Sequence, residues 1–413
     1  MHPFTGLATR EDGAICACCR SHPVGFIDKE SLEEIWNNDT IRRIRRQVLN
    51  NERPPECAPC FNLEDQGVES LRQRHITNRI PESRINLYPN ALDSLGEDYT
   101  MPFEIPTMEL KLNNLCNLAC RMCHPMDSTS WTDWSEVKEF YKKEGNIMYA
   151  IVEEHGLESK PFLDKFQDSP EWWASLEKNL SHFRRVEFAG GEPLMDPQHY
   201  RILDMLKPYG HQIELKYATN GTTLGISKGR TVHEYWPHFK SVAVNVSLDG
   251  IGDVYDYIRS NSDWNLVVKN IKEIQAIPNI SRVVGACTVQ ISNILVLDKI
   301  IECFLNELGI IFHSHRVEYP NVLSAQVLPK ELKDLAYHRL EAVKSRLHRF
   351  KLCKDNPRLI EYTLGQIQDN QNYLRAKDQS DLWPDCVEFN RRLDLSRQSK
   401  SFIDVNPEFA KYA

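Results

Sequence analysis

The chain has 413 residues, of which 41% are hydrophobic and 26% are charged, a composition that is ordinary for a globular enzyme. Its formal net charge of −8 argues against a general nucleic-acid binder, because such proteins need an excess of lysine and arginine for phosphate contacts. No uninterrupted apolar stretch is long enough to span a bilayer, and no amino-terminal signal peptide is recognisable, so we expect a cytoplasmic protein.

The first 105 residues are expected to form a small module and a linker. Residues 1–80 predict a short strand, a loop and a helix from Ser31 to Asn50, where apolar residues recur at helical intervals. Residues 81–105 hold several prolines and little periodicity, as a linker does.

Residues 106–320 alternate short β-type runs with helical stretches, which predicts an α/β fold with a parallel sheet. The predicted helices are Gln198–Leu206, Asp263–Ala276 and Asn293–Leu308. The predicted strands are Thr107–Leu112, Arg185–Ala189, Ile213–Ala218, Val242–Leu248, Arg282–Gln290 and His313–Glu318. Residues 321–413 are expected to form a polar, mostly helical extension. The long connection 124–183 is expected either to cover the active site or to pack as an ordinary insertion.

The most informative motif is C-x3-C-x2-C, formed by Cys116, Cys120 and Cys123. A loop of this length can hold an iron–sulfur cube by three thiolates, which leaves one iron open for a small molecule. One alternative is a structural zinc site with His124 as the fourth ligand, although zinc ligands usually come as two separated pairs. A disulfide framework is a second alternative, which a cytoplasmic chain does not favour.

This motif resembles the signature of radical S-adenosylmethionine (SAM) enzymes. The resemblance implies a partial (β/α)6 barrel with the cysteine loop after its first strand, and a [4Fe–4S] cluster whose open iron chelates SAM. An electron from the cluster then cleaves SAM to a 5′-deoxyadenosyl radical, which abstracts a hydrogen atom from the substrate. Met122 stands where many family members have an aromatic residue beside the adenine, and its apolar side chain can serve there.

The second predicted barrel strand ends in Gly190-Gly191-Glu192-Pro193. Two glycines let the backbone approach a ligand, and Glu192 offers a carboxylate to a cation, although such a run also suits a plain turn. The run resembles the GGEP motif of the family, which implies that Gly190, Gly191 and Glu192 hold the SAM ammonium group. The third strand ends in Thr219-Asn220-Gly221, which supports the register of the family pattern.

Further candidates follow the fourth and fifth strands. Alternation places Asn245, Ser247 and Asp249 on one face, and the resemblance implies a SAM contact for Ser247. Asp249 is either a proton acceptor or, the reading that we favour, a turn residue. Arg259 suits either a clamp on the SAM carboxylate or a surface salt bridge, and Asn293 is a candidate contact of the adenine or ribose.

A second group of cysteines lies near the amino terminus. Cys57-x2-Cys60 is a metal clip by its spacing, and Cys18-Cys19 lies upstream of it. Together with neighbouring residues they resemble the twitch/SPASM domain, which implies a second, auxiliary [4Fe–4S] cluster held by Cys18, Cys19, Cys57 and Cys60, with Cys16 as a further candidate. In most relatives this domain follows the barrel, whereas here it precedes it. Structural zinc is the alternative.

These resemblances imply a radical SAM enzyme, with peptide or protein maturation as the first expectation for its reaction. The alternative is oxidation or rearrangement of a small molecule such as a sugar, nucleotide or antibiotic precursor. An electron donor such as flavodoxin or ferredoxin is expected as a partner. A non-enzymatic alternative is that the protein is a zinc- or cluster-binding scaffold without catalytic activity. The expected domains are the module 1–80, the linker 81–105, the barrel 106–320 and the extension 321–413.

Overall fold

The fold is that of a computed structural model, which describes residues 2–65, 70–76, 90, 92–158, 160, 162–317 and 319–412. The chain divides into two compact units, and the division falls within strands β7 (Glu214–Thr219) and β10 (Ser241–Ser247). Unit 1 comprises Met1–Asn114, Leu163–Tyr217 and Ser227–Val242. Unit 2 comprises Leu115–Phe162, Ala218–Ile226 and Ala243–Ala413.

Unit 1 contains one sheet in which the strands are ordered β7-β6-β4-β1-β2-β3. The strands besides β7 are β1 (Gly6–Thr9), β2 (Ala14–Cys16), β3 (Pro23–Phe26), β4 (Thr107–Lys111) and β6 (Arg185–Ala189). The pairs β1–β4, β4–β6 and β6–β7 are parallel, whereas β2 pairs antiparallel with β1 and with β3. The cysteine-bearing amino-terminal segment therefore continues the sheet of the predicted barrel strands.

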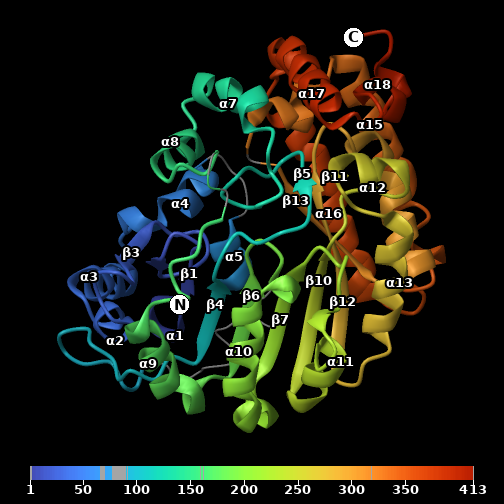
Figure 1. The fold of residues 1–413 in the computed structure, drawn as a ribbon. Coiled ribbons are helices and arrows are strands. Elements are labelled where there is room, and N and C mark those ends of the chain that lie inside the picture. Colours follow the sequence, from blue (N-terminus) through green and yellow to red (C-terminus); the bar gives the residue numbers. More distant parts are fainter. Residues whose placement is uncertain are drawn as a thin grey trace. The chain divides into compact units, whose positions relative to one another are not determined.

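Gly6 explains how β1 comes so close to β4. A Cβ atom on residue 6 would lie 2.6 Å from the carbonyl oxygen of Thr107, its register partner. Only glycine leaves room for this approach. Figure 1 shows β1 beside β4 in unit 1. The expected domain boundaries stay a prediction, although the pairing of β1 with β4 joins the first expected domain to the third.

The helices of unit 1 correct one expectation. The segment Ser31–Asn50, predicted as one helix, forms α2 (Leu32–Trp36) and α3 (Asp39–Leu49). The break occurs because the side chain of Asn38 caps α3 by accepting a hydrogen bond from the Ile41 amide at 3.0 Å. The other helices of unit 1 are α1 (His2–Thr5), α4 (Ala58–Asp65), α5 (Leu71–Ile76), α9 (Pro170–Asn179), α10 (Pro197–Leu206) and α11 (Val232–Tyr235).

Unit 2 contains the strand order β13-β12-β10. Strands β12 (Ile280–Val289) and β13 (Ile311–Arg316) are parallel, and the Leu248 amide after β10 donates to the Ala286 carbonyl of β12 at 2.8 Å. A separate short pair joins β5 (Ala119–Cys120) to β11 (Arg259–Ser260) in antiparallel register. Strands β8 (Gly225–Ser227) and β9 (Arg230–Thr231) complete the described strands.

The helices of unit 2 include the carboxy-terminal extension, which runs toward the red end of the colour scale in Figure 1. They are α7 (Trp134–Lys143), α8 (Ile147–Glu154), α12 (Asp253–Ile258), α13 (Trp264–Gln275), α14 (Leu297–Glu302), α15 (Lys330–Lys344), α16 (Pro357–Ala376), α17 (Trp383–Arg397) and α18 (Phe402–Val405). The predicted helix Asn293–Leu308 is instead a 3-10 turn, α14 and a π-helical stretch, Cys303–Leu308, which ends at Gly309.

The expected fold class is confirmed: the chain is mixed α/β with parallel strands and a helical carboxy-terminal extension. All six predicted barrel strands are present, and none of their ends differs from the prediction by more than two residues. Glu318, the last residue of the sixth predicted strand, lies outside the described residues, as does most of the first half of the predicted linker. No helix in the described parts of the chain is long and apolar enough to cross a membrane.

Candidate radical SAM site

The three-cysteine loop lies in unit 2. Cys116 and Cys120 are buried and Cys123 is half-buried. Cys120 ends β5, where it faces Arg259 of β11, and the Cys123 amide closes a turn onto the Cys120 carbonyl at 3.0 Å. The short β5–β11 pair thus anchors the middle of the loop, and a turn joins Cys120 to Cys123. Within the described part of the chain, the three thiols are not placed as a ready group for a single metal ion.

Residues that follow the loop hold its backbone. The hydroxyl of Ser130 donates to the Cys116 carbonyl at 2.7 Å, and the indole N–H of Trp131 donates to the Cys120 carbonyl at 2.8 Å. These side chains satisfy carbonyl groups that no helix or long strand engages. Trp131 is therefore a support of the cysteine loop.

The tryptophans of the segment 124–183 are all buried. Trp131 and Trp134 in unit 2 are each 1% exposed, and Trp172 and Trp173 in unit 1 are 0% and 8% exposed. Burial of this degree favours the expectation of a packed insertion for these side chains, because each fills the interior of its own unit.

Asn220 contacts the first cysteine of the loop. Its amide nitrogen lies 3.7 Å from Cys116 Sγ and donates to Asn117 Oδ1 at 2.9 Å. Gly221, which follows, has φ +72°, and a Cβ there would lie 2.9 Å from a methyl carbon of Val246. The sequence pattern assigns the Thr219-Asn220-Gly221 run to register alone, and the structure adds a direct contact between Asn220 and a candidate ligand.

Arg259 lies beside the central cysteine and is only 8% exposed, so the alternative of a surface salt bridge is wrong. Its Nη1 lies 3.5 Å from Cys120 Sγ, and its Nη2 lies 2.8 Å from Oδ2 of the fully buried Asp249. The Thr288 amide donates to the other oxygen of Asp249 at 2.6 Å. Asp249 thus holds Arg259 against the cysteine loop.

The charges of this group are set by burial and by the partners. Burial raises the pKa of the Asp249 carboxyl, and Arg259 opposes that rise. For Arg259, burial alone would lower the pKa, but the adjacent Asp249 and Cys120 outweigh it, so the pKa rises and the guanidinium stays protonated. A hydrogen bond from Cys123 lowers the pKa of Cys120, and the positive charges of Arg259 and Arg397 act in the same direction. The same hydrogen bond, together with burial, raises the pKa of Cys123.

The loop after β12 carries polar groups at the same end of unit 2. The Gln290 amide nitrogen lies 3.8 Å from the sulfur of Met122, inside the cysteine loop. Among the residues that the structure describes, Gln290 Oε1 and Ser292 Oγ are buried without a hydrogen-bond partner. Such groups are rare in proteins and suit a polar ligand. The sequence analysis missed both residues, because an isolated Gln or Ser after a strand carries no motif.

The remaining candidates of unit 2 lie on β10 and in the turn after β12. Asn245 and Ser247 are half-buried on β10, while Val244 before them and Val246 between them are buried, as alternation predicts. Asn293 is fully buried, and its amide group bonds to Asp249, Thr288 and Gln290 at 2.8–2.9 Å. These bonds use the Asn293 amide to shape the turn, so its role toward a ligand stays a prediction.

The glycine-rich run lies in unit 1, after β6. Gly190 has φ +120°, and a Cβ there would lie 3.1 Å from the Asn113 carbonyl oxygen, which also accepts from the Gly191 amide at 3.3 Å. Glu192 is 1% exposed, and its carboxylate accepts from the Leu194 amide at 3.0 Å. Gly190 is therefore favoured by its positive φ and by the nearby Asn113 carbonyl oxygen, independently of any ligand.

Three of the amino-terminal cysteines, Cys18, Cys57 and Cys60, influence one another's pKa in unit 1. Burial raises the pKa of Cys57 to about 12, and the neighbouring thiols of Cys18 and Cys60 add to the rise. A hydrogen bond from the His22 amide to the Glu56 carbonyl at 2.9 Å joins the loop that carries Cys18 to the turn that carries Cys57.

Cys16 and Cys19 are less clearly part of that group. Cys16 is fully buried at the end of β2, and burial raises its pKa to about 11. Cys19 is half-buried in the loop that follows. Among the described residues, no three His, Cys, Asp or Glu side chains are placed to hold a single metal ion.

Comparison with known families identifies the two cysteine regions. Residues 110–290 match the family model described as the radical SAM superfamily, and residues 1–61 match the model described as an iron-sulfur cluster-binding domain, SPASM. The match to the radical SAM superfamily thus covers 181 of the 413 residues. These matches agree with the two predicted cysteine regions, and the SPASM match precedes the radical SAM match along the chain. Domains of these two kinds imply iron–sulfur clusters and SAM as cofactors.

Solved structures of three kinds are similar to parts of the chain at low identity. A histidine-tagged anSMEcpe with bound AdoMet is 14% identical with a TM-score of 0.38, over 59% of this chain and 60% of that one. Streptococcus suis SuiB bound to precursor peptide SuiA is 13% identical with a TM-score of 0.34, over 82% and 69% of the two chains. TYW1 with a lysine-pyruvate adduct is 12% identical with a TM-score of 0.28, over 60% and 71%. The matched part thus spans about 60% of the anSMEcpe chain. No curated protein matches the chain.

The residues of the radical SAM domain fit the group that the domain implies. Three cysteines lie within residues 116–123, and a buried guanidinium lies against the central thiol. Buried oxygen atoms of Gln290 and Ser292 lack partners within the described part of the chain. Thiolates are the ligands of iron–sulfur clusters, and their negative charge suits an adjacent arginine.

Proposed function

We propose that the protein is a radical SAM enzyme in which Cys116, Cys120 and Cys123 hold the SAM-binding [4Fe–4S] cluster. The observation that carries the proposal is the C-x3-C-x2-C turn with Arg259 and Asp249 buried against Cys120. When bound, this cluster supplies the electron that cleaves SAM to methionine and a 5′-deoxyadenosyl radical. The open iron of a three-cysteine site is what allows SAM to bind there.

The chain's own residues would bind and orient SAM. Gly190, Gly191 and Glu192 would hold its ammonium group, and Ser247 would contact SAM from the end of β10. Gln290, whose amide nitrogen contacts Met122, and Ser292 carry buried oxygen atoms that suit the donors of a nucleoside. Asp249 keeps Arg259 charged and fixed, so it acts by positioning rather than as a proton acceptor.

An auxiliary cluster in the SPASM domain completes the proposal. Cys18, Cys57 and Cys60 would be its first ligands, because their thiols interact electrostatically, and Cys19 or Cys16 would supply a fourth. Such a cluster can accept an electron from a substrate radical or bind the substrate near SAM. Because relatives with such domains include peptide-modifying enzymes, we propose a peptide or protein substrate. The reductant would be a flavodoxin or ferredoxin.

Iron and sulfide analysis of anoxically purified protein tests the cofactor assignment. Two cubes require about eight irons per chain, four for each cluster. Zinc in place of iron would instead support a non-catalytic scaffold.

Loss of one thiolate tests the SAM cluster. Cys120→Ala should abolish 5′-deoxyadenosine formation from SAM under reducing conditions, because only three thiolates hold this cluster. Cys303→Ser, which changes a buried cysteine outside both groups, is the matched control and should retain activity. Undiminished 5′-deoxyadenosine formation by Cys120→Ala would refute the ligand assignment.

The substrate class is tested by stimulation of SAM cleavage. A mixed library of synthetic peptides should increase 5′-deoxyadenosine formation by the loaded wild-type enzyme, with a matching mass change in a peptide. Stimulation by a small-molecule extract alone would overturn the peptide assignment and leave the radical SAM chemistry standing.

A further inference from the structure

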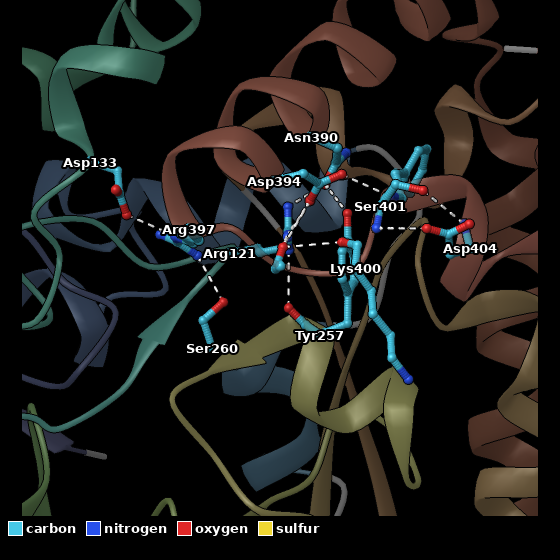
Figure 2. Close-up of polar contacts among 12 residues, drawn as sticks. Arg121, Asp133, Tyr257, Ser260, Asn390, Asp394, Arg397, Lys400, Ser401 and Asp404 are labelled. Carbon is cyan, nitrogen blue, oxygen red and sulfur yellow. Dashed lines mark hydrogen bonds and ion pairs between the residues drawn. The ribbon is translucent and has the colours of Figure 1, made fainter.

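Helix α17 lies outside both matched domains and yet contacts the cysteine loop. Asn390, Asp394 and Arg397 are spaced by four and three residues, so they share one face of the helix. Figure 2 shows these three side chains among Arg121, Tyr257 and Ser260, all in unit 2. Asn390 and Asp394 are buried, although the side chains are polar, which requires partners for them.

Arg121 is the partner on the cysteine loop, where it stands between Cys120 and Cys123. Its side chain is 0% exposed, and it donates to Asp394 Oδ1 at 2.5 Å and to Asn390 Oδ1 at 3.2 Å. The same guanidinium donates to the Tyr257 carbonyl at 3.0 Å and stacks 3.6 Å from the centre of the Tyr257 ring. A residue flanked by two candidate ligands is thus fixed by side chains about 270 positions later.

Arg397 makes the second contact from the end of α17. Its Nη1 donates to the Ala119 carbonyl at 2.8 Å and to the Ser260 hydroxyl at 3.0 Å, so it spans the β5–β11 pair. Its Nε donates to Asp133 at 2.8 Å, and its guanidinium lies 4.8 Å from the centre of the Trp131 ring. Trp131 in turn holds the Cys120 carbonyl.

Two buried guanidinium atoms near Cys120 have no hydrogen-bond partner among the described residues. They are Nη2 of Arg397 and Nε of Arg259, on side chains that are only 9% and 10% exposed. Buried cationic donors without partners point to a negatively charged group that they would face, and thiolate-bound iron–sulfur clusters have that character.

The end of α17 is shaped to present Arg397. The helix stops there because Gln398 adopts a left-handed conformation with φ 50°, and the Ser399 amide bonds back to the Asp394 carbonyl at 3.1 Å. Asp394 also accepts from the Phe402 amide at 2.7 Å, which ties the start of α18 to the same carboxylate. Asp394 therefore links the cysteine loop, α17 and α18.

We propose that α17 is a clamp on the cysteine loop, in which Asn390 and Asp394 fix Arg121 while Arg397 fixes β5 and adds positive charge beside Cys120. The mechanical part of this proposal stands on the contacts alone, whereas the electrostatic part rests on the proposed function. Asp394 and Arg397 are positioning residues in this scheme. They act on the loop that holds the cysteines and not on the substrate.

The mechanical part is tested in the apoprotein by the alkylation of individual cysteines with iodoacetamide, followed by peptide mass spectrometry. Arg397→Lys and Asp394→Asn should increase the labelling rates of Cys120 and Cys123 by about tenfold, since each weakens a buried charged contact. Cys386, buried within α17 itself, should keep its wild-type rate and shows that the helix stays folded. The matched control is Arg391→Ala, because Arg391 is exposed on the same helix and pairs with Glu388 of that helix.

Labelling of Cys120 and Cys123 at wild-type rates in both variants would overturn the clamp. Faster labelling of Cys386 together with the loop cysteines would overturn it too, because α17 would then have unfolded as a whole. The alkylation measurement needs no cluster. If the wild-type protein bound no iron, the proposed function would be refuted, but the labelling rates would still decide whether α17 clamps the loop.

The electrostatic part is tested in the anoxically loaded protein. Arg397→Ala should lower the reduction potential of the SAM cluster, because a nearby positive charge favours the reduced state, and Arg397→Lys should restore most of the shift. Iron release to a chelator should be faster in both variants. Equal potentials in the wild type and Arg397→Ala would overturn the electrostatic role, and failure of Lys to restore the potential would do so as well.

Discussion

At the residue scale, the decisive arrangement is the buried group around Cys120. A cysteine loop alone does not fix the charge of its ligands. In this protein Asp249 is fully buried, binds Arg259 at 2.8 Å, and so holds a cation 3.5 Å from Cys120 Sγ. The pair therefore fixes a buried guanidinium beside Cys120, and the positive charge of Arg259 lowers the pKa of that thiol while Asp249 opposes the change.

Removal of the buried carboxylate should be costly. Asp249→Ala leaves Arg259 buried without its counter-ion, which we expect to lower the free energy of unfolding by about 3–5 kcal/mol. Urea unfolding of the apoprotein measures the loss. Asp253→Ala, which breaks the exposed Asp253–Lys400 pair, is the control and should cost under about 1 kcal/mol. A loss for Asp249→Ala as small as that of the control would contradict the structural role of the pair.

At the scale of elements, α10 packs a neutral histidine against the sheet of unit 1. His199 is 1% exposed, and its Nε2 lies 2.8 Å from the Tyr217 hydroxyl of β7. The ring also makes edge contacts with Phe188 and Tyr200. Burial lowers the pKa of His199 to about 3, because the protonated form would lose its hydration.

This histidine predicts a pH dependence of stability. Between pH 3 and the ordinary histidine pKa of about 6.5, the unfolded chain binds the proton and the folded chain does not, so stability falls as the pH falls through this window. His199→Phe should remove about 1.4 kcal/mol per pH unit from that slope. Urea unfolding at several pH values measures it, and the exposed His238→Gln is the control. An unchanged slope in His199→Phe would show that His199 is protonated in the folded state.

At the scale of the whole molecule, the chain consists of two compact units, and its two cysteine groups belong to different units. The auxiliary candidates Cys18, Cys57 and Cys60 are in unit 1, and the SAM-cluster candidates are in unit 2. The order of the domains is the reverse of that in most relatives with such an auxiliary domain. The carboxy-terminal extension belongs to unit 2 and supplies the helix that contacts the cysteine loop.

Separate cysteine groups predict separable functions. Cys57→Ala should leave reductive SAM cleavage largely intact and block product formation, because the auxiliary cluster would act on the substrate and not on SAM. 5′-Deoxyadenosine and product are quantified in the same reaction, with Cys353→Ala as the control. Full turnover by Cys57→Ala would remove the auxiliary cluster from the mechanism.

The sequence was sufficient for features that depend on neighbours along the chain. Ligand spacing in C-x3-C-x2-C, the Gly-Gly turn after β6 and the alternation on β10 are local patterns, so all six barrel strands and the radical SAM domain were predictable. The prediction of one continuous helix over residues 31–50 was wrong, because two helices form there. Asn38 caps the start of α3, although the apolar residues recur at helical intervals across the break.

Only the tertiary structure decided which distant side chains meet at the cysteine loop. Arg121 binds Asp394 across 273 positions, and Arg397 binds Ala119 across 278. No period or motif connects such residues, because their contact depends on how helices and strands pack. The sequence by itself thus determined the cysteine spacing and the match to a radical SAM domain, whereas packing decided which residues hold the cysteine loop in place.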